Sequence, residues 1–248
     1  MSDINEQKKL ASELAGKLWA MANDLRGTME AYEFKNYILG LIFYKHLSDK
    51  TEAFLIEAFE HDDITYEKAW EDEELRQELA DDMLESLGFV MEPKYLFPNV
   101  IKMVNNDTFT IDYMEEIIAS ITDSTIGRDS EEDFKGLFED MDLKSSKLGR
   151  ELKQRGKLIG KILKQIDSMG GTDVDILGTA YITLIGNFAS TAGKKGGEFY
   201  TPTNMSKLVA RLATVGLTDV LSAFDCACGS GSLLLQVGQF AKVRKYFG

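Results

Sequence analysis

Apolar residues recur at helical spacing through the first part of the chain. The segment 31–60 is nearly apolar through its middle, which is typical of one or two central buried helices. The apolar stripe that begins at Leu75 and stops before Gly88 predicts an amphipathic helix. The predicted helices cover residues 14–26, 31–60, 75–87, 113–122 and 131–138. No stretch before about Ser146 alternates like a strand for long, so the first region is predicted to be an α-helical domain.

Two of the three prolines fall close together, in the segment 89–100. Pro93 and Pro98 each lack a backbone N–H, and each biases the residue before it toward an extended conformation. This segment is therefore predicted to be a loop between helices.

The pattern changes after residue 200. Thr201 can cap a helix whose first turn holds Pro202, because the missing N–H of a proline has no partner there in any case. The apolar positions of this helix are expected to form its buried stripe: Met205, Leu208, Val209 and Leu212. The segment DVLSAFD, residues 219–225, predicts a buried parallel strand without a partner strand, and LLLQVGQF predicts a helix behind the next turn. The second region therefore opens a strand–turn–helix α/β unit.

Composition is that of an ordinary globular protein, with 44% hydrophobic and 28% charged residues. No apolar run approaches the ~18 residues that a membrane span needs, and the polar start MSDINEQKKL is not a secretory signal. We therefore expect a cytoplasmic protein without membrane contact.

Charge is divided unevenly along the chain, whose formal net charge is -13. Residues 1–150 hold 16 Lys and Arg against 34 Asp and Glu, a net of -18, whereas residues 151–248 hold 12 against 7, a net of +5. An acidic surface repels phosphates, so the first part by itself disfavours nucleic acid. The asymmetry indicates two regions with different roles.

Basic residues gather on one side of the segment 147–166 when it is drawn as one continuous helix. That side holds Lys147, Arg150, Lys153, Lys157, Lys161 and Lys164, and the apolar side holds Leu148, Leu152, Ile159, Ile162, Leu163 and Ile166. Two interpretations stay open: a solvated face of a core helix, or a stripe that contacts phosphates or a partner. Gly149, Gly156 and Gly160 each cost up to ~1 kcal/mol relative to alanine in a helix, which indicates close packing or bending.

The stretch FDCACGSGSLL, residues 224–234, places an acidic residue and a glycine-rich turn after the predicted strand. Such a turn brings bare backbone to a ligand and directs helix N–H groups at an anion. The dinucleotide pattern G-x-G-x-x-G fails, because Leu234 stands where the third glycine would follow Gly229 and Gly231. The carboxylate of Asp225 can pair with the ammonium group of S-adenosylmethionine, while the start of the helix after the two glycines can meet the carboxylate of the same cofactor. From the turn alone, another nucleotide or a structural turn stay open.

Other residues that often carry chemistry give no site of their own. Cys226 and Cys228 are too few for a structural zinc site, which needs four ligands, and we interpret them as small apolar fillers. His46 and His61 lie in helical segments, and we assign them no chemistry and no metal. The aromatic pair 199–200 is either a hydrophobic staple on the next helix or a wall of a ligand site.

The motif GGEFYTP (196–202) and, further along, DCACGSGSLL (225–234) together resemble the modification (M) subunit of type I restriction–modification systems. The segments LWAMANDLRG, FKNYILGLIFYKHLSDKTE and ILGTAYITLIGNFA resemble the helical N-terminal region of that family and its junction. The resemblance runs from about Leu18 to the end of the chain. Cys226 stands where the family commonly has proline, a departure that would loosen the turn without removing cofactor contacts.

The resemblance implies a mainly α fold, in which a helical N-terminal domain (1–168) precedes the beginning of a Rossmann-like α/β S-adenosylmethionine-dependent methyltransferase domain (169–248). It also implies methyl transfer from S-adenosylmethionine to adenine N6 in DNA, with a specificity subunit and a restriction subunit as partners. The segment 198–202 would form one wall of the cofactor pocket, and the glycine turn would hold the methionine part. The cofactor residues implied are Glu198, Phe199, Tyr200, Thr201, Pro202, Asp225, Gly229, Ser230 and Gly231.

The catalytic element of that family is an Asn-Pro-Pro-aromatic loop, which binds the flipped target adenine. None of the three prolines here follows an asparagine or adjoins another proline, so no catalytic residue is assigned. The acidic residue expected ~20 residues beyond the turn to bind ribose would fall at or past Gly248. We therefore expect a truncated N-terminal piece of a larger subunit, inactive alone. The alternative is a non-catalytic helical interaction module that contacts partner subunits or DNA.

Overall fold

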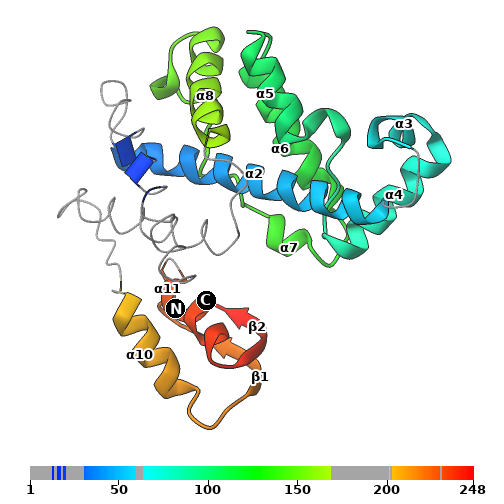
Figure 1. Ribbon diagram of the computed structural model, residues 1–248. Helices are drawn as coiled ribbons and strands as arrows, with labels where there is room; N and C mark the ends of the chain where they lie inside the picture. Colours follow the sequence, from blue (N-terminus) through cyan, green and yellow to red (C-terminus); the bar gives the residue numbers. More distant parts are fainter. Residues whose placement is uncertain are drawn as a thin grey trace. The chain divides into compact units, whose positions relative to one another are not determined.

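The computed structural model describes residues 31–59, 64–168, 201, 203–229 and 231–248, together with positions 13, 16, 17, 19 and 20 (Figure 1). By its internal contacts the chain divides into two compact units, Met1–Leu177 and Gly178–Gly248. The helix predicted over 14–26 lies mostly outside the described residues. The domain boundary after residue 168 stays a prediction.

Helix α2, Ala31–Ala58, forms the centre of the first unit. It is one helix of 28 residues, which settles the choice between one and two. Phe34 and Tyr44 are both fully buried on it. Because apolar side chains encircle much of α2, more than one helix packs against it. Both α5 (Phe97–Asn105) and α8 (Leu152–Asp167) contact it, and Figure 1 shows them on the same side of α2.

Shorter elements complete the described part of this unit. They are α3 (Tyr66–Glu71), α4 (Glu73–Ser86), η1 (Pro93–Tyr95), α6 (Ile111–Ser124), α7 (Glu131–Phe134) and η2 (Ser146–Leu148). Helix α4 is the amphipathic helix predicted before Gly88, and Leu79 and Met83 are buried on it, whereas Leu75 is exposed. Gly88 follows in the left-handed conformation, with φ 82°, as expected for a residue that ends a helix.

The loop predicted over 89–100 is present only at residues 89–92 and at Leu96, because the rest of the segment is helical. Pro93 opens η1, and Pro98 lies in the first turn of α5. The prediction was wrong because a proline in the first turn loses no hydrogen bond, since the N–H it lacks has no acceptor within the helix. The N–H of Phe97, at the start of α5, donates instead to Ser48 Oγ of α2, at 2.8 Å.

Helix α8 begins later than the sequence predicted. Gly149 has φ 142° and separates η2 from the helix, so Lys147 and Arg150 precede α8 and do not share its face. Leu152, its first residue, is exposed. The rest of the predicted apolar side is buried: Leu148 on η2, and Ile159, Ile162, Leu163 and Ile166 on α8.

Two glycines let α8 approach its neighbours closely. A Cβ on Gly156 would lie 3.3 Å from the backbone N of Ile111, and one on Gly160 would lie 3.1 Å from Val104 Cγ1. Both distances are shorter than ordinary van der Waals contacts between carbon and its neighbours. Close packing against α5 and the start of α6 is therefore the reason for glycine at these two positions.

The second unit contains a parallel β–α–β arrangement. Its described elements are α10 (Thr203–Ala213), β1 (Asp219–Phe224), α11 (Ser232–Gln236), η3 (Val237–Gln239) and β2 (Lys242–Phe247). Strand β1 pairs with β2 in parallel, with Asp219 opposite Lys242 and Phe224 opposite Phe247. The expectation of a strand without a partner was wrong. The predicted strand–turn–helix order is confirmed, since α11 follows β1 and its turn.

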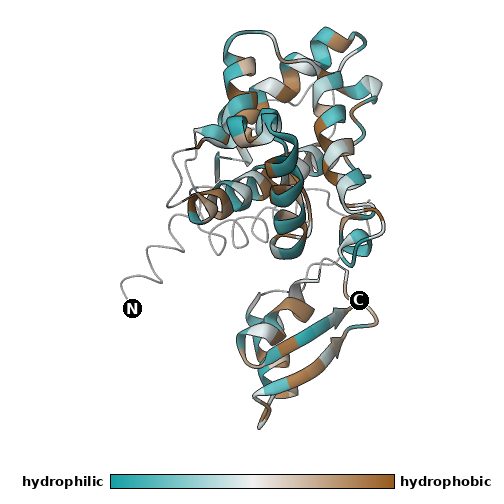
Figure 2. Cartoon of the chain, turned by 90° about the vertical axis from the view of Figure 1, so that its right-hand side faces the viewer, coloured by the Kyte–Doolittle hydropathy of each residue, from teal (hydrophilic) through white to brown (hydrophobic). Residues whose placement is uncertain are grey.

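Two burial predictions for this unit were also wrong. The stripe predicted to be buried on α10 is exposed: Met205, Leu208, Val209 and Leu212. On β1, Leu221 and Phe224 are 74% and 71% exposed. Figure 2 shows apolar and polar segments along both strands. Periodicity reveals which face of an element is apolar, but burial depends on whether another element covers that face.

Candidate functional site

The two parallel strands end at the same edge of the sheet, and Asp225 lies at that edge. Its backbone N–H donates to the carbonyl oxygen of Phe247, at 3.0 Å, which ties the start of the turn to the end of β2. Its carboxylate Oδ1 accepts from the N–H of Ala227, also at 3.0 Å. The described residues offer no hydrogen bond to Oδ2, so this oxygen can accept one from a ligand.

The two glycines of the turn adopt left-handed backbone conformations, with φ 53° at Gly229 and φ 71° at Gly231. A Cβ on Gly229 would meet no heavy atom within 4 Å, so the backbone there borders open space. Gly231 caps α11: its N–H donates to Cys228 O at 2.8 Å, and its carbonyl oxygen accepts from Leu235 N–H at 2.9 Å. Bare backbone therefore lies beside the carboxyl ends of parallel strands, where open α/β sheets bind ligands.

The cysteines of the turn are free, and Cys226 is exposed while Cys228 is half-buried. The interpretation as small apolar fillers is wrong for Cys226, because its side chain does not lie in a core. Over the part of the chain that the structure describes, no group of three or more His, Cys, Asp or Glu residues could hold a metal ion. His46 is half-buried on α2, and His61 lies outside the described residues.

The second predicted wall of the site is described only at Thr201, which is exposed. The other predicted cofactor residues outside the described ranges are Glu198, Phe199, Tyr200, Pro202 and Ser230. The structure thus places Asp225, Gly229 and Gly231 together in one turn, and the roles of all nine residues remain predictions.

Comparison with known proteins gives the family. Residues 14–166 match the HsdM N-terminal domain, and residues 172–246 match the N-6 DNA Methylase family. The methylase subunit of the type I restriction enzyme MpnII of Mycoplasma pneumoniae is 38% identical over 233 residues, which cover 89% of this chain and 43% of that protein. This chain belongs to the family of type I restriction–modification methylase subunits.

Other members of the methylase-subunit family agree with this assignment. The methylase subunit of the type I restriction enzyme MjaIX of Methanocaldococcus jannaschii is 30% identical over 236 residues, covering 92% of this chain and 39% of that protein. The crystal structure of the type I restriction–modification system methyltransferase subunit from Streptococcus thermophilus matches with a TM-score of 0.81 and 32% identity. That match covers 96% of this chain and 52% of the other. The chain thus spans about half the length of the relatives that it matches.

These findings confirm the resemblance seen in the sequence, and with it a mainly α fold in which a helical domain precedes the beginning of a methyltransferase domain. No described helix is both long enough and apolar enough to cross a membrane.

Sequence reasoning missed β2, which completes the edge beside Asp225. Its segment KVRKYF holds three basic residues and has little alternation, so its pattern resembles that of a solvated loop. The available signal was its position, because a parallel strand is expected after a strand–turn–helix unit.

Proposed function

We propose that this chain supplies the helical domain and the first part of the catalytic domain of a type I methylase subunit, which transfers a methyl group from S-adenosylmethionine to adenine N6 in DNA. The observation that carries this proposal is the order of the two family matches, with the Asp225–Gly231 turn inside the second. The subunit works in the cytoplasm with a specificity subunit, which reads the DNA sequence, and with a restriction subunit.

The turn suits the methionine part of the cofactor. Oδ2 of Asp225, to which no described residue donates, would accept a hydrogen bond from the ammonium group, and the bare backbone at Gly229 and Gly231 would approach the amino-acid moiety. The open space beside Gly229 leaves room for this approach. By the family resemblance, residues 198–202 would form the opposite wall. When bound, S-adenosylmethionine supplies an activated methyl group, and the chain's own residues bind and orient its amino-acid end.

We expect the 248-residue chain by itself to bind this cofactor weakly or not at all and to transfer no methyl group. Its sequence contains no Asn-Pro-Pro-aromatic run to hold the adenine amino group in line with the methyl group. Each directed contact with the cofactor that this chain does not make weakens binding by about 1 kcal/mol. About 1.4 kcal/mol corresponds to a tenfold change in affinity.

The test compares the chain with a longer subunit of the length of its relatives, assembled with its specificity partner. Equilibrium dialysis measures binding of labelled S-adenosylmethionine, and transfer of label to adenine in target DNA measures activity. Asp225→Asn in the longer subunit should weaken cofactor binding at least tenfold, because the amide loses the negative charge that pairs with the ammonium group. The asparagine keeps an oxygen that accepts from Ala227 N–H, so the turn itself should survive.

Asp219→Asn is the control, because Asp219 lies at the opposite end of β1 and pairs with Arg244 at 3.6 Å. This variant should bind cofactor like the parent. Equal cofactor affinity of both variants would show that Asp225 does not bind the cofactor. Label in adenine after incubation with the 248-residue chain would contradict its inactivity, and a longer subunit that binds no cofactor would favour the non-catalytic interaction module.

A further inference from the structure

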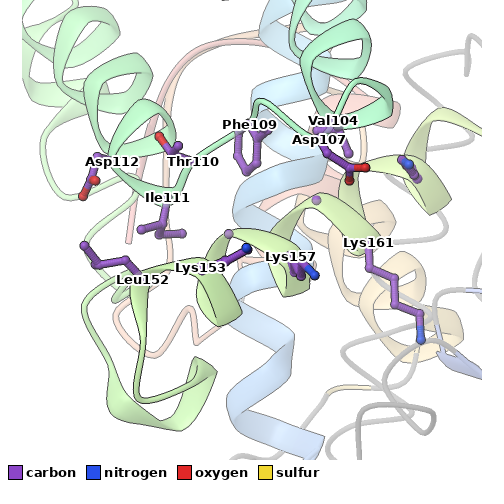
Figure 3. Close-up of a pocket in the computed structure, with 13 residues that line it drawn as sticks. Val104, Asp107, Phe109, Thr110, Ile111, Asp112, Leu152, Lys153, Lys157 and Lys161 are labelled. Carbon is purple, nitrogen blue, oxygen red and sulfur yellow. The ribbon is translucent and has the colours of Figure 1, made fainter.

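A second surface of interest lies within the helical unit, between α8 and the connection from α5 to α6. There the structure forms a groove of about 830 Å³. Gly156 and Gly160 lie where the helix backbone comes closest to the opposite wall. Asp107 and residues 109–112 form that wall, and Figure 3 shows them across from α8, which carries Lys153 and Lys157. Four lysines line the groove from α8: Lys153, Lys157, Lys161 and Lys164. We call these four residues the α8 lysine row.

The positive charges of the α8 lysine row are not paired in salt bridges with described residues. All four side chains are exposed, and none forms a salt bridge with any residue in the described ranges. Other lysines of the same unit do find carboxylates, as Lys45 does with Asp49 and Lys144 with Glu115. Residues 1–150 have a net charge of -18, and Asp107 and Asp112 line the same groove, so the absence of salt bridges along this row is not due to a shortage of acidic residues.

The row is linear and held in place. Lys153, Lys157 and Lys161 are each four residues apart, so they rise about 6 Å from one to the next along one side of α8. The whole row spans about 16 Å. The opposite side of α8 is anchored by buried isoleucines and a leucine, and the two glycines fix its distance from the neighbouring helices. A rigid line of cations of this length suits a linear polyanion.

The opposite wall distinguishes between two kinds of polyanion. Asp107 and Asp112 line the groove there, and both are exposed. An acidic peptide seated inside the groove would bring its carboxylates next to both aspartates, which costs energy through like-charge repulsion. A DNA backbone that lies along the outer edge of α8 contacts the lysines and stays away from both aspartates. Charge complementarity therefore favours phosphates at the rim of the groove.

We propose that the α8 lysine row binds the phosphate backbone of DNA, independently of sequence and apart from the cofactor turn. This inference rests on the proposed function, which makes DNA the substrate, and it adds that the helical domain itself holds the duplex. Lys147 and Arg150, which precede α8, are not part of this surface.

Fluorescence anisotropy of the intact chain with labelled duplexes tests the proposal, without cofactor and with two unrelated DNA sequences. The variant changes all four lysines of the row to glutamine. Its affinity should fall at least tenfold at low salt and equally for both duplexes, since phosphate contacts carry no sequence information. Each phosphate contact contributes about 0.9 to the slope of log affinity against log salt, so the slope should flatten by up to about 3.6.

A charge-matched control changes four exposed lysines elsewhere in the unit to glutamine: Lys50, Lys68, Lys135 and Lys144. Its net charge equals that of the row variant, so its slope should stay near that of the parent. A third variant, Asp107→Asn with Asp112→Asn, should bind DNA at least as tightly as the parent, because it removes negative charge from the groove and leaves the lysines unchanged.

Several results would overturn the proposal. One is an unchanged salt slope in the row variant, and another is the same loss in the control variant. Binding of polyglutamate as tight as binding of DNA at equal salt would make the surface an acidic-peptide site instead. If a longer subunit methylates DNA and its row variant keeps the parent slope, the proposed function stands and the lysine row is wrong. If the row variant loses affinity but the longer subunit binds no cofactor, the lysine row is supported and the proposed function is wrong.

Discussion

The start of α5 depends on a hydroxyl group from a distant helix. The N–H of Phe97 is buried, and the preceding residue, Leu96, offers no side-chain cap. Ser48 of α2 accepts this N–H through Oγ at 2.8 Å and donates its own proton to Glu52 Oε1 at 3.0 Å. Ser48 is completely buried. Replacing Ser48 by alanine should therefore leave the Phe97 amide without an acceptor in a place that water does not reach.

The cost follows from that orphaned amide. A buried donor that loses its acceptor destabilises a protein by about 1–3 kcal/mol. The loss of the small hydroxyl group leaves little empty volume, so the unpaired amide accounts for most of the effect. Glu52 is half-buried and can recover its lost hydrogen bond from water, so it adds little. We expect Ser48→Ala to lower the free energy of unfolding of the helical unit by about 1–3 kcal/mol. Urea unfolding followed by far-ultraviolet circular dichroism measures this change as a lower midpoint at unchanged slope.

Thr51→Val is the matched control. Thr51 lies on the same helix and is also fully buried, but its hydroxyl donates only to Leu47 O of its own helix, at 3.0 Å. That carbonyl keeps its partner in the helix after the change, and valine preserves the shape, so the variant should be about as stable as the parent. A Ser48→Ala variant that loses less than about 0.5 kcal/mol, or no more than Thr51→Val, would refute the argument.

Two further predictions concern packing and pH. Gly156→Val should destabilise the helical unit by about 1–3 kcal/mol, because its side chain would press on the backbone at Ile111, and a variant with the parent's urea midpoint would contradict the close approach. Burial, and after it the charge of Lys50, lower the pKa of His46, so the unfolded chain takes up a proton at a pH where the folded chain does not. Stability should therefore decrease as pH falls below about 6.5, and His46→Asn should remove that part of the decrease. Urea midpoints at about pH 7.5 and pH 5.5 measure it, and equal pH dependence in both proteins would rule out this role of His46.

The sequence by itself determined the features that rest on neighbouring residues. The nearly apolar middle of the segment 31–60 predicted one or two central helices, and one helix, Ala31–Ala58, is present. The order strand, acidic residue, glycine turn and helix at 219–236 was also predicted, because backbone conformation in such a unit depends on residues only a few positions apart. The same stretch carried the resemblance that the family comparisons confirm.

Only the tertiary structure decided which apolar faces are covered and which polar groups meet. Met205 and Leu221 have the pattern of core residues but are exposed, and no periodicity distinguishes a covered face from an open one. The bond from Phe97 to Ser48 joins residues 49 positions apart, and it supplies an acceptor for an N–H at the start of α5, in a segment that was predicted to be a loop. The α8 lysine row lines the same groove as Asp107 and Asp112 only because two glycines bring α8 against the α5–α6 connection. Such contacts depend on the packing of whole elements, since segments far apart in the chain become neighbours only when the core forms.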